Sequence, residues 1–127
     1  MAKISGITTA VTVAGNVISN DVTSIDLDTP YGVEDITAVD NVAMARLLLR
    51  ADATGTLTGI FNTAASMSHA TLKTPGVKTF VIAYAAAAAT ATFSAVTTNY
   101  HVVMAADGSL VWDVNFQLSS GTAVAWT

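Results

Sequence analysis

The chain has 127 residues, no cysteine and a formal net charge of −4, which predicts one domain over residues 1–127 and excludes disulfides and thiolate metal sites. Charged residues make up 11% of the chain, and because a soluble domain usually has roughly 25%, large parts of the surface must be uncharged. The five basic residues are scattered rather than clustered, which argues against binding to the phosphate backbone of a nucleic acid.

The N-terminal part of the chain predicts two strands around Gly15 and Asn16. In the second strand, Ser24, Asp26 and Asp28 alternate with apolar residues. Their side chains therefore share one face, because successive side chains of a strand point to opposite sides. This strand is expected to carry an acidic face.

Residues 41–51 predict a helix. Asp40 suits its N-cap, because a carboxylate there accepts hydrogen bonds from the free N–H groups of the first turn. Arg50 lies near the C-terminal end, where a cation is favourable. The residues that fit one apolar helical stripe are Val42, Ala45, Leu48 and Leu49, widened by Met44 and Leu47.

The segment "TGTLTGIFN" follows this helix and alternates like a strand. Gly55 and Gly59 within it indicate a bulge or a close approach of the backbone. A short helical turn is predicted at residues 64–70, before Pro75 and Gly76 end the segment.

The C-terminal half predicts further strands. "VKTFVIAY" and "ATFSAVTT" are two of them, with a loop or strand extension expected at residues 85–89. Residues 100–118 predict a hairpin around Asp107 and Gly108, a pair typical of type I′ turns. One face of its second strand, which must meet a core, carries Leu110, Trp112, Val114, Phe116 and Leu118. The other face carries Ser109, Asp113, Asn115 and Gln117.

Together these elements predict a mainly β protein of about seven or eight strands. We expect an antiparallel β-sandwich or barrel with one flanking α-helix at residues 41–51 and a short helical turn at residues 64–70. No repeat or linker divides the chain.

No pattern of residues predicts catalysis, a metal site or a cofactor. His69 and His101 have no second histidine or carboxylate cluster at ligand spacing, and no nucleophile motif of the form GxSxG is present. Asp26 and Asp28, with the acidic residues after them, lack the spacing of an EF-hand calcium loop. We therefore expect no enzyme.

Membrane insertion is not expected either. Residues 79–106 contain no charged residue, but the continuous apolar core of this stretch, "FVIAYAAAAA", is about half as long as a membrane-spanning helix. Strands that are buried or lie at an interface explain the stretch better.

The low charge predicts self-association. Large uncharged regions on a soluble monomer tend to associate, so the surface is expected to be covered, most simply by further copies of the chain. The alternative is a monomer whose surface is coated by Thr and Ser hydroxyl groups.

The order and spacing of several segments resemble a small family of tail tube (major tail) proteins of long-tailed bacteriophages. The segments that carry the resemblance are "DITAVD", "RLLLRAD", "GIFN", "SHATLKT" and the closing "GTAVAWT". The match covers nearly the whole chain, and the Ala-rich residues 85–89 depart from the family pattern. None of these segments is a chemical motif.

The resemblance implies a structural virion protein that assembles into hexameric rings, which stack into the hollow tail tube. Its location would be the virion, after assembly in the host cytoplasm. The implied partners are further copies, a tape-measure protein, other tail proteins, and DNA that passes through without sequence-specific binding. An acidic protein suits that passage, because like charges discourage the phosphate backbone from adhering.

Two groups of residues are candidates for roles in such a tube. A strand with one polar and one apolar face could turn its polar face toward the channel. Alternatively, the polar face could belong to the ordinary outer surface of the protein. The channel candidates are Ser24, Asp26, Asp28, Asp113, Asn115 and Gln117. Arg46 and Arg50, on the predicted helix, are candidates for contacts to a neighbouring copy.

Two other functions remain open from the sequence. A capsid decoration protein is also a small β domain with oligomeric interfaces, although such proteins typically form trimers. A monomeric ligand-binding sandwich would need exposed aromatic residues around a groove. Aromatic residues make up only 7% of this chain, and several lie on the inward face of one strand.

Overall fold

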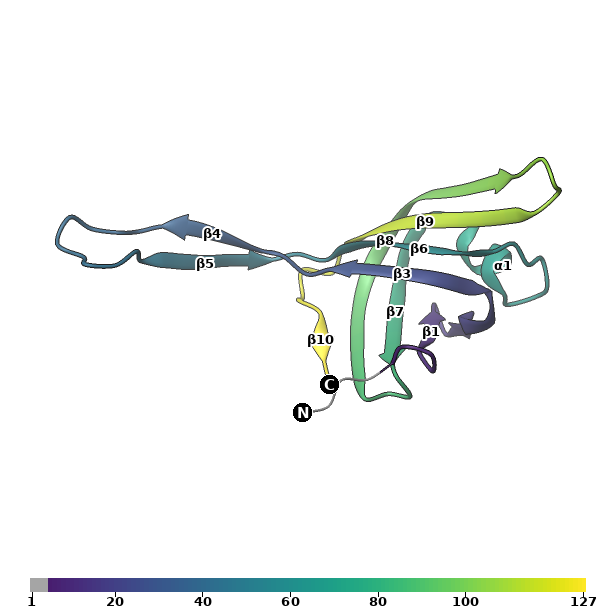
Figure 1. The fold of residues 1–127 in the computed structure, drawn as a ribbon, viewed down its shortest axis with the longest axis horizontal. Coiled ribbons are helices and arrows are strands. Elements are labelled where there is room, and N and C mark those ends of the chain that lie inside the picture. Colours follow the sequence, from purple (N-terminus) through teal and green to yellow (C-terminus); the bar gives the residue numbers. More distant parts are fainter. Residues whose placement is uncertain (1–4) are drawn as a thin grey trace.

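The computed structural model describes residues 5–127, and antiparallel strands dominate it (Figure 1). The main sheet has the strand order β2-β1-β7-β8-β9-β6-β3, with β10 on β8, and a separate hairpin pairs β4 with β5. The strands are β1 (Ala10–Val13), β2 (Asn16–Val17), β3 (Val22–Asp28), β4 (Tyr31–Asp35), β5 (Arg46–Ala51), β6 (Thr54–Ile60), β7 (Gly76–Tyr84), β8 (Ala89–Met104), β9 (Leu110–Leu118) and β10 (Ala125–Trp126). The predicted mainly antiparallel β fold is confirmed, as one curled half-barrel sheet.

The 16-residue strand β8 joins the two parts of this sheet. Its first part pairs with β7 from Ala89 to Thr97, and its second part pairs with β9 as far as Met104. A shift of register between Thr97 and Asn99 marks an irregularity where the strand can bend. Because β8 is shared, the sheet curls over its own inner face.

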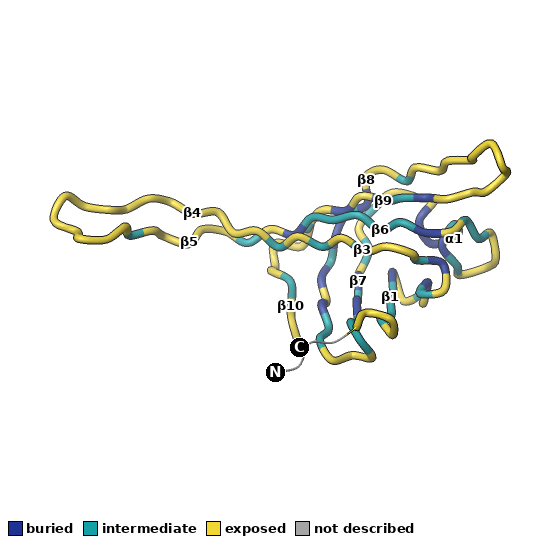
Figure 2. The backbone as a smooth tube through the Cα atoms, viewed as in Figure 1, coloured by how far each residue is buried: buried dark blue, intermediate teal, exposed yellow. Residues whose placement is uncertain are grey.

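The inner face of the curl holds the core (Figure 2). Phe80, Phe93 and Phe116 pack together there, with ring centroids 4.9 to 5.5 Å apart. The indole of Trp112 is buried, and its Nε1–H donates to the backbone oxygen of Ile60 at 2.8 Å. The inward face predicted for β9 is thus confirmed at Trp112 and Phe116. Leu110 lies beyond the core and is exposed.

The helical turn predicted at residues 64–70 lies slightly later, as α1 (Ser68–Leu72). A 3-10 turn at Ser19–Asp21 holds it in place through the buried carboxylate of Asp21. That carboxylate accepts from Asn62 Nδ2 at 3.0 Å and from the backbone N–H of Ser68 at 3.1 Å. Asp21, just before β3, therefore holds the loop after β6 in place through these two hydrogen bonds.

The helix predicted at residues 41–51 is wrong, because this segment forms the strand β5 and the turn before it. An isolated helix of this length is marginal in water, and this segment has no core surface beside it on which an apolar stripe could pack. Pairing with β4 supplies backbone hydrogen bonds instead. Because no helix begins after Asp40, its predicted role as an N-cap is also wrong. In the turn between β4 and β5, Asn41 Oδ1 instead accepts a hydrogen bond from the backbone N–H of Ala38 at 2.6 Å.

The turn between β7 and β8 contains three consecutive alanines in the left-handed region, Ala85, Ala86 and Ala87, with φ between 52° and 66°. This conformation costs a non-glycine residue roughly 1–2 kcal/mol. The N-terminal segment supports the turn, because Thr8 and Thr9 accept hydrogen bonds from its backbone N–H groups at 3.1 and 3.3 Å.

Replacing Ala86 with glycine should stabilise the protein. Glycine adopts positive φ without steric cost but loses more entropy on folding, so we expect Ala86→Gly to add about 0.5–1 kcal/mol to the free energy of unfolding. The urea midpoint at unchanged slope measures this. The control is Ala83→Gly within β7, which should lower the midpoint. A fall of the midpoint in both variants would contradict the prediction.

Candidate assembly surfaces

A polar face covers one side of the sheet formed by β3, β6, β9 and the second part of β8. Two complete cross-strand rows run over these strands, Ser24–Thr58–Asp113–His101 and Asp26–Thr56–Asn115–Asn99, and a third contains Asp28–Thr54–Gln117. Partners across neighbouring antiparallel strands share a face, so these rows lie side by side. We call these eleven residues the polar face; each is exposed or half-exposed.

All six channel candidates lie on this polar face. The three from β3 and the three from β9 are far apart in sequence, but β6 brings them together by pairing with both strands. Sequence reasoning missed the members on β6 and β8. The alternating threonines of "TGTLTGI" were the signal for those on β6.

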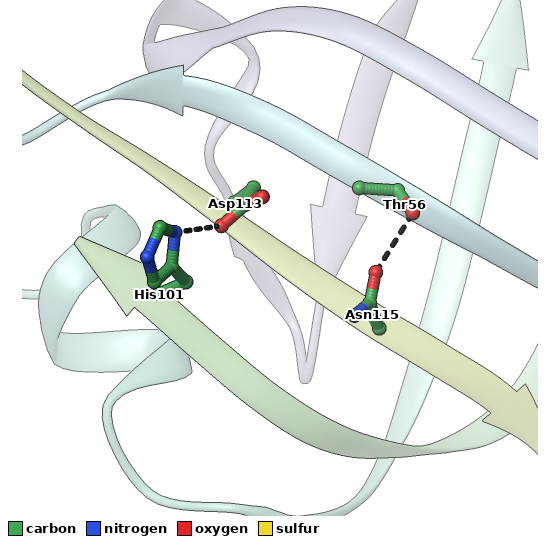
Figure 3. A network of polar contacts seen from close by, with 4 residues as sticks. All are labelled: Thr56, His101, Asp113 and Asn115. Carbon is green, nitrogen blue, oxygen red and sulfur yellow. Dashed lines mark hydrogen bonds and ion pairs between the residues drawn. The ribbon is translucent and has the colours of Figure 1, made fainter. Parts of the chain in front are cut away.

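Side-chain contacts connect the strands across the polar face (Figure 3). The Thr56 hydroxyl donates to Asn115 Oδ1 at 2.8 Å, and His101 Nδ1 lies 3.0 Å from Asp113 Oδ1. No hydroxyl group within residues 5–127 is hydrogen bonded to His101, so the His–Asp pair lacks the nucleophile of a catalytic triad. The face carries carboxylates, the imidazole of His101, and hydroxyl and amide groups, but no Lys or Arg.

Two backbone edges of this four-stranded sheet are open. Within residues 5–127, β3 pairs only with β6, and β8 from Asn99 to Met104 pairs only with β9, because its pairing with β7 ends at Thr97. Unpaired strand edges present free N–H and C=O groups that can pair with another chain. Each edge is therefore a possible contact surface.

The hairpin of β4 and β5 extends away from the curled sheet as a long arm (Figures 1 and 2). We call residues 31–51 the arm. Every residue of β4 and all of β5 except Ala51 are exposed. The register places Val33 opposite Leu48 on one face, and Glu34 opposite Leu47 on the other. Each face thus exposes leucine, and a lone two-stranded hairpin of this kind is at best marginally stable in water.

The two candidate arginines lie on the arm, in β5 rather than on a helix. Arg46 stands opposite Asp35 in the register. Within the described range, neither Arg46 nor Arg50 forms an ion pair. Two hydrogen bonds from Thr37 hold the pKa of the exposed Asp35 carboxyl below its usual value. The bond from the Thr37 side chain has the larger effect, and the bond from its backbone N–H has the smaller one.

A second group of exposed apolar side chains lies where β8 and β9 protrude beyond the core, together with the end of β6. We call it the hairpin end, and its members are Ile60, Val102, Val103, Met104, Leu110 and Val111. Ile60, Val103 and Val111 are neighbours on one face, and the other three lie on the opposite face.

The turn that closes this hairpin is centred on Ala106 and Asp107, one residue earlier than predicted, because the N–H of Gly108 donates to the backbone oxygen of Ala105 at 2.9 Å. Within this turn only Gly108, which follows the two central residues, has a positive φ, of 90°, so the turn is not of type I′. The backbone N–H of Ser109 donates to Asp107 Oδ1 at 3.0 Å. This bond, with a smaller contribution from the Ser109 side chain, holds the pKa of Asp107 below its usual value.

Other kinds of site are not found in the part of the chain that the structure describes. There, no three His, Asp or Glu side chains gather as they would around a metal ion. No helix among these residues has the length and apolar character to cross a membrane.

No protein-family model matches the sequence, and no curated protein matches it. The fold, by contrast, has close neighbours among solved structures. A chain of a structure described as "Virion of native gene transfer agent (GTA) particle" is 12% identical, with a TM-score of 0.78 over 98% of this chain and 99% of that one. A chain of "Tail of empty GTA particle computed with helical refinement, C6 symmetry" is 14% identical, with a TM-score of 0.68 over 87% and 86%.

The chain has the fold of a gene transfer agent tail protein. The predicted resemblance to phage tail proteins is thereby confirmed at the level of the fold. The likeness to the chain of the virion structure extends over 98% of this chain, so it includes the arm as well as the curled sheet.

Proposed function

We propose that this protein is a structural virion protein, without enzymatic activity, that self-assembles into the tube of a phage-like tail. The main observation that supports this proposal is the exposed arm. It exposes leucine on both faces and extends away from its own curled sheet, so it is suited to be covered by other copies. The neighbours in fold come from particles with tails, which supports the same function.

We further infer that six copies close into a ring through the two open sheet edges. β3 and β8 run in opposite directions, because each of the intervening pairs is antiparallel. Joining the β3 edge of one copy to the β8 edge of the next therefore continues an antiparallel sheet around the ring. Two different edges make a heterologous contact, which closes when the rotation fits. The C6 symmetry stated for the related tail supports six copies.

In such a ring the polar face lines the channel, because its rows of polar side chains run across all four strands of the continuous sheet, with Ile60, Val103 and Val111 at one end of the same side. Its carboxylates would repel the phosphate backbone and let DNA pass without adhering. The tape-measure protein would occupy this channel during assembly, other tail proteins would contact the ends of the tube, and the finished protein would reside in the virion after assembly in the host cytoplasm.

Electron microscopy of negatively stained protein, together with its sedimentation, tests the proposal. Sixfold rings or tubes are the expected result. A chain that stays monomeric at high concentration, alone and with tail initiator proteins, would refute it. A trimeric mass without rings would favour a capsid decoration protein instead.

Reversing charge on the polar face should make the channel retain DNA. We expect tubes of the Asp26→Lys, Asp28→Lys, Asp113→Lys variant to assemble normally but to bind DNA in a salt-dependent way and to impair genome ejection. Asparagine at the same three positions is the matched control, because it removes the repulsion without adding attraction. Normal ejection and no DNA retention in the lysine variant would show that the polar face lies outside the channel.

A further inference from the structure

Among the eleven residues of the polar face, His101 is the one that can carry a positive charge, because the face has no Lys or Arg. His101 lies in the second part of β8, on one of the two open edges of the sheet. The other open edge, β3, carries Asp26 and Asp28 on the same face. One edge therefore holds a group that can become a cation, and the edge that it would meet in a ring holds two anions.

Within its own copy, His101 faces the carboxylate of Asp113 on β9. Nδ1 of the imidazole lies 3.0 Å from Asp113 Oδ1, and because an ionised carboxylate only accepts hydrogen bonds, Nδ1–H is the donor. Nε2 lies on the side of the ring away from Asp113 (Figure 3). The His101 side chain is 58% exposed, so Nε2 is accessible to a neighbouring copy. The remaining members of its row and its neighbours on the same face of β8 are uncharged: Ser24, Thr58, Asn99 and Val103.

The alternation of side chains limits how the two edges can pair in a ring. A shift by one residue would turn the polar residues of one strand to the apolar side, so the register changes only in steps of two. His101 then stands opposite Ser24, Asp26 or Asp28 of the next copy. Residues directly opposite or diagonal across an antiparallel pair are within reach of an aromatic side chain. In each of these three registers, Asp26 is opposite or diagonal to His101.

We propose that His101 forms an ion pair with Asp26 of the next copy, so that closing each seam of the ring binds one proton. A neutral imidazole that donates through Nδ1 has no hydrogen on Nε2, and the carboxylate of Asp26 offers only lone pairs. The contact therefore forms when a proton from solvent is added to Nε2. The new N–H donates to Asp26 of the next copy, while Nδ1–H keeps its bond to Asp113.

This pairing makes the stability of the ring depend on pH. The closed seam holds the proton more tightly than the free chain does, because a second carboxylate faces the imidazole. Lowering the pH from about 8 to about 6, the range in which imidazole takes up a proton, therefore favours closed rings, and raising the pH removes the added stability. At about pH 8 the backbone hydrogen bonds of the seam act alone, so the lysine variant of the polar face should still form tubes there. This inference rests on the proposed ring.

The critical concentration for assembly, measured by sedimentation at about pH 6 and about pH 8, tests the proposal. Each added copy closes one seam, so we expect a value roughly threefold lower at the acidic pH, as one exposed ion pair would give. His101→Gln should lose this difference. His101→Lys, which is charged at both pH values, should assemble at the higher pH as the unaltered protein does at the lower one. Asp26→Asn should lose the difference as well.

Asp107→Asn is the matched control for the loss of a carboxylate. It removes the same charge from the turn after β8, outside the polar face, and keeps an oxygen for the backbone N–H of Ser109. The threefold difference should therefore persist in this variant. His101, Asp26 and Asp107 are all exposed, and thermal melting at both pH values checks that each variant is folded.

Cysteine cross-linking locates the pair, because the chain contains no cysteine of its own. Assembled protein with His101→Cys and Asp26→Cys in separate copies is treated with a short bifunctional maleimide. We expect more than about tenfold the yield of His101→Cys with Val17→Cys, because a fixed contact raises the effective concentration into the millimolar range. Val17 is the control because it is exposed and lies on β2, away from both open edges.

The outcomes separate this inference from the proposed function. Rings that cross-link His101 to Val17 as strongly as to Asp26 would overturn the seam pair but leave the ring intact. The same conclusion would follow if His101→Gln kept the full pH difference of the unaltered protein. Absence of rings at both pH values, in the unaltered protein and in every variant, would overturn the ring and the pair together.

Discussion

Replacing residues 30–52 with an Asn-Gly turn is expected to abolish tube formation while the rest of the protein folds normally. The pair Asp28–Thr54 remains in register, and a two-residue turn joins such strands directly. The arm contains no buried residue, so its removal takes nothing from the core. Sedimentation should show no species above single rings, and the melting temperature should lie within about 4 °C of the unaltered protein, which corresponds to less than about 1 kcal/mol.

Variants that keep the arm but change its chemistry are the controls. Leu47→Ser with Leu48→Ser should block tubes as the deletion does, because each face of the arm loses an exposed leucine. Arg46→Gln with Arg50→Gln should weaken assembly only slightly, since an exposed ion pair contributes about 0–1 kcal/mol. Tubes of normal length from the deletion would refute the role of the arm.

Gly59→Ala is expected to unfold the junction of β3 and β6. A Cβ at this position would overlap the backbone oxygen of Asp21 and lie 2.7 Å from Cζ2 of Trp112. Neither can give way cheaply, because one is backbone and the other is a buried ring. We expect a loss of at least about 3 kcal/mol in the free energy of unfolding, measured by urea denaturation or by loss of soluble protein.

The control for this variant is Gly6→Ala. Among the described residues, a Cβ there would meet only the hydroxyl of Thr9, at an ordinary distance of 3.5 Å, so the urea midpoint should hardly change. Gly55→Ala should resemble Gly59→Ala, because its Cβ would overlap the backbone oxygen of Asp26 and lie 2.6 Å from Phe116. A Gly59→Ala protein with an unchanged midpoint would show that β3 can shift without cost.

The strands could be predicted from the sequence wherever one face is apolar and the other polar, as in β9. The same reasoning predicted a bulge or a close approach of the backbone at Gly55 and Gly59, and the structure has the close approach. It failed at residues 41–51 because three consecutive leucines fit both a helical stripe and a strand with two apolar faces. Only the partner of the segment decides between them, and here the antiparallel pairing with β4 makes it a strand.

The candidate sites were predictable in part. Alternation assigned each polar residue of β3 and β9 to a strand face, and the pairing of both strands with β6 then placed the two faces together. Sequence alone could not show this, because register between distant strands depends on the whole sheet. Whether the polar face lines a channel and whether the arginines of the arm touch a neighbour remain predictions.

The continuity of β8 has a mechanical consequence. In the proposed tube, a load applied to the channel wall would pass from the second part of β8 to its first part, beside β7, along one covalent backbone and without crossing a joint between packed side chains. A tube built from such units would resist shear within each copy and, when overstrained, would break at the seams between copies rather than by unravelling its strands.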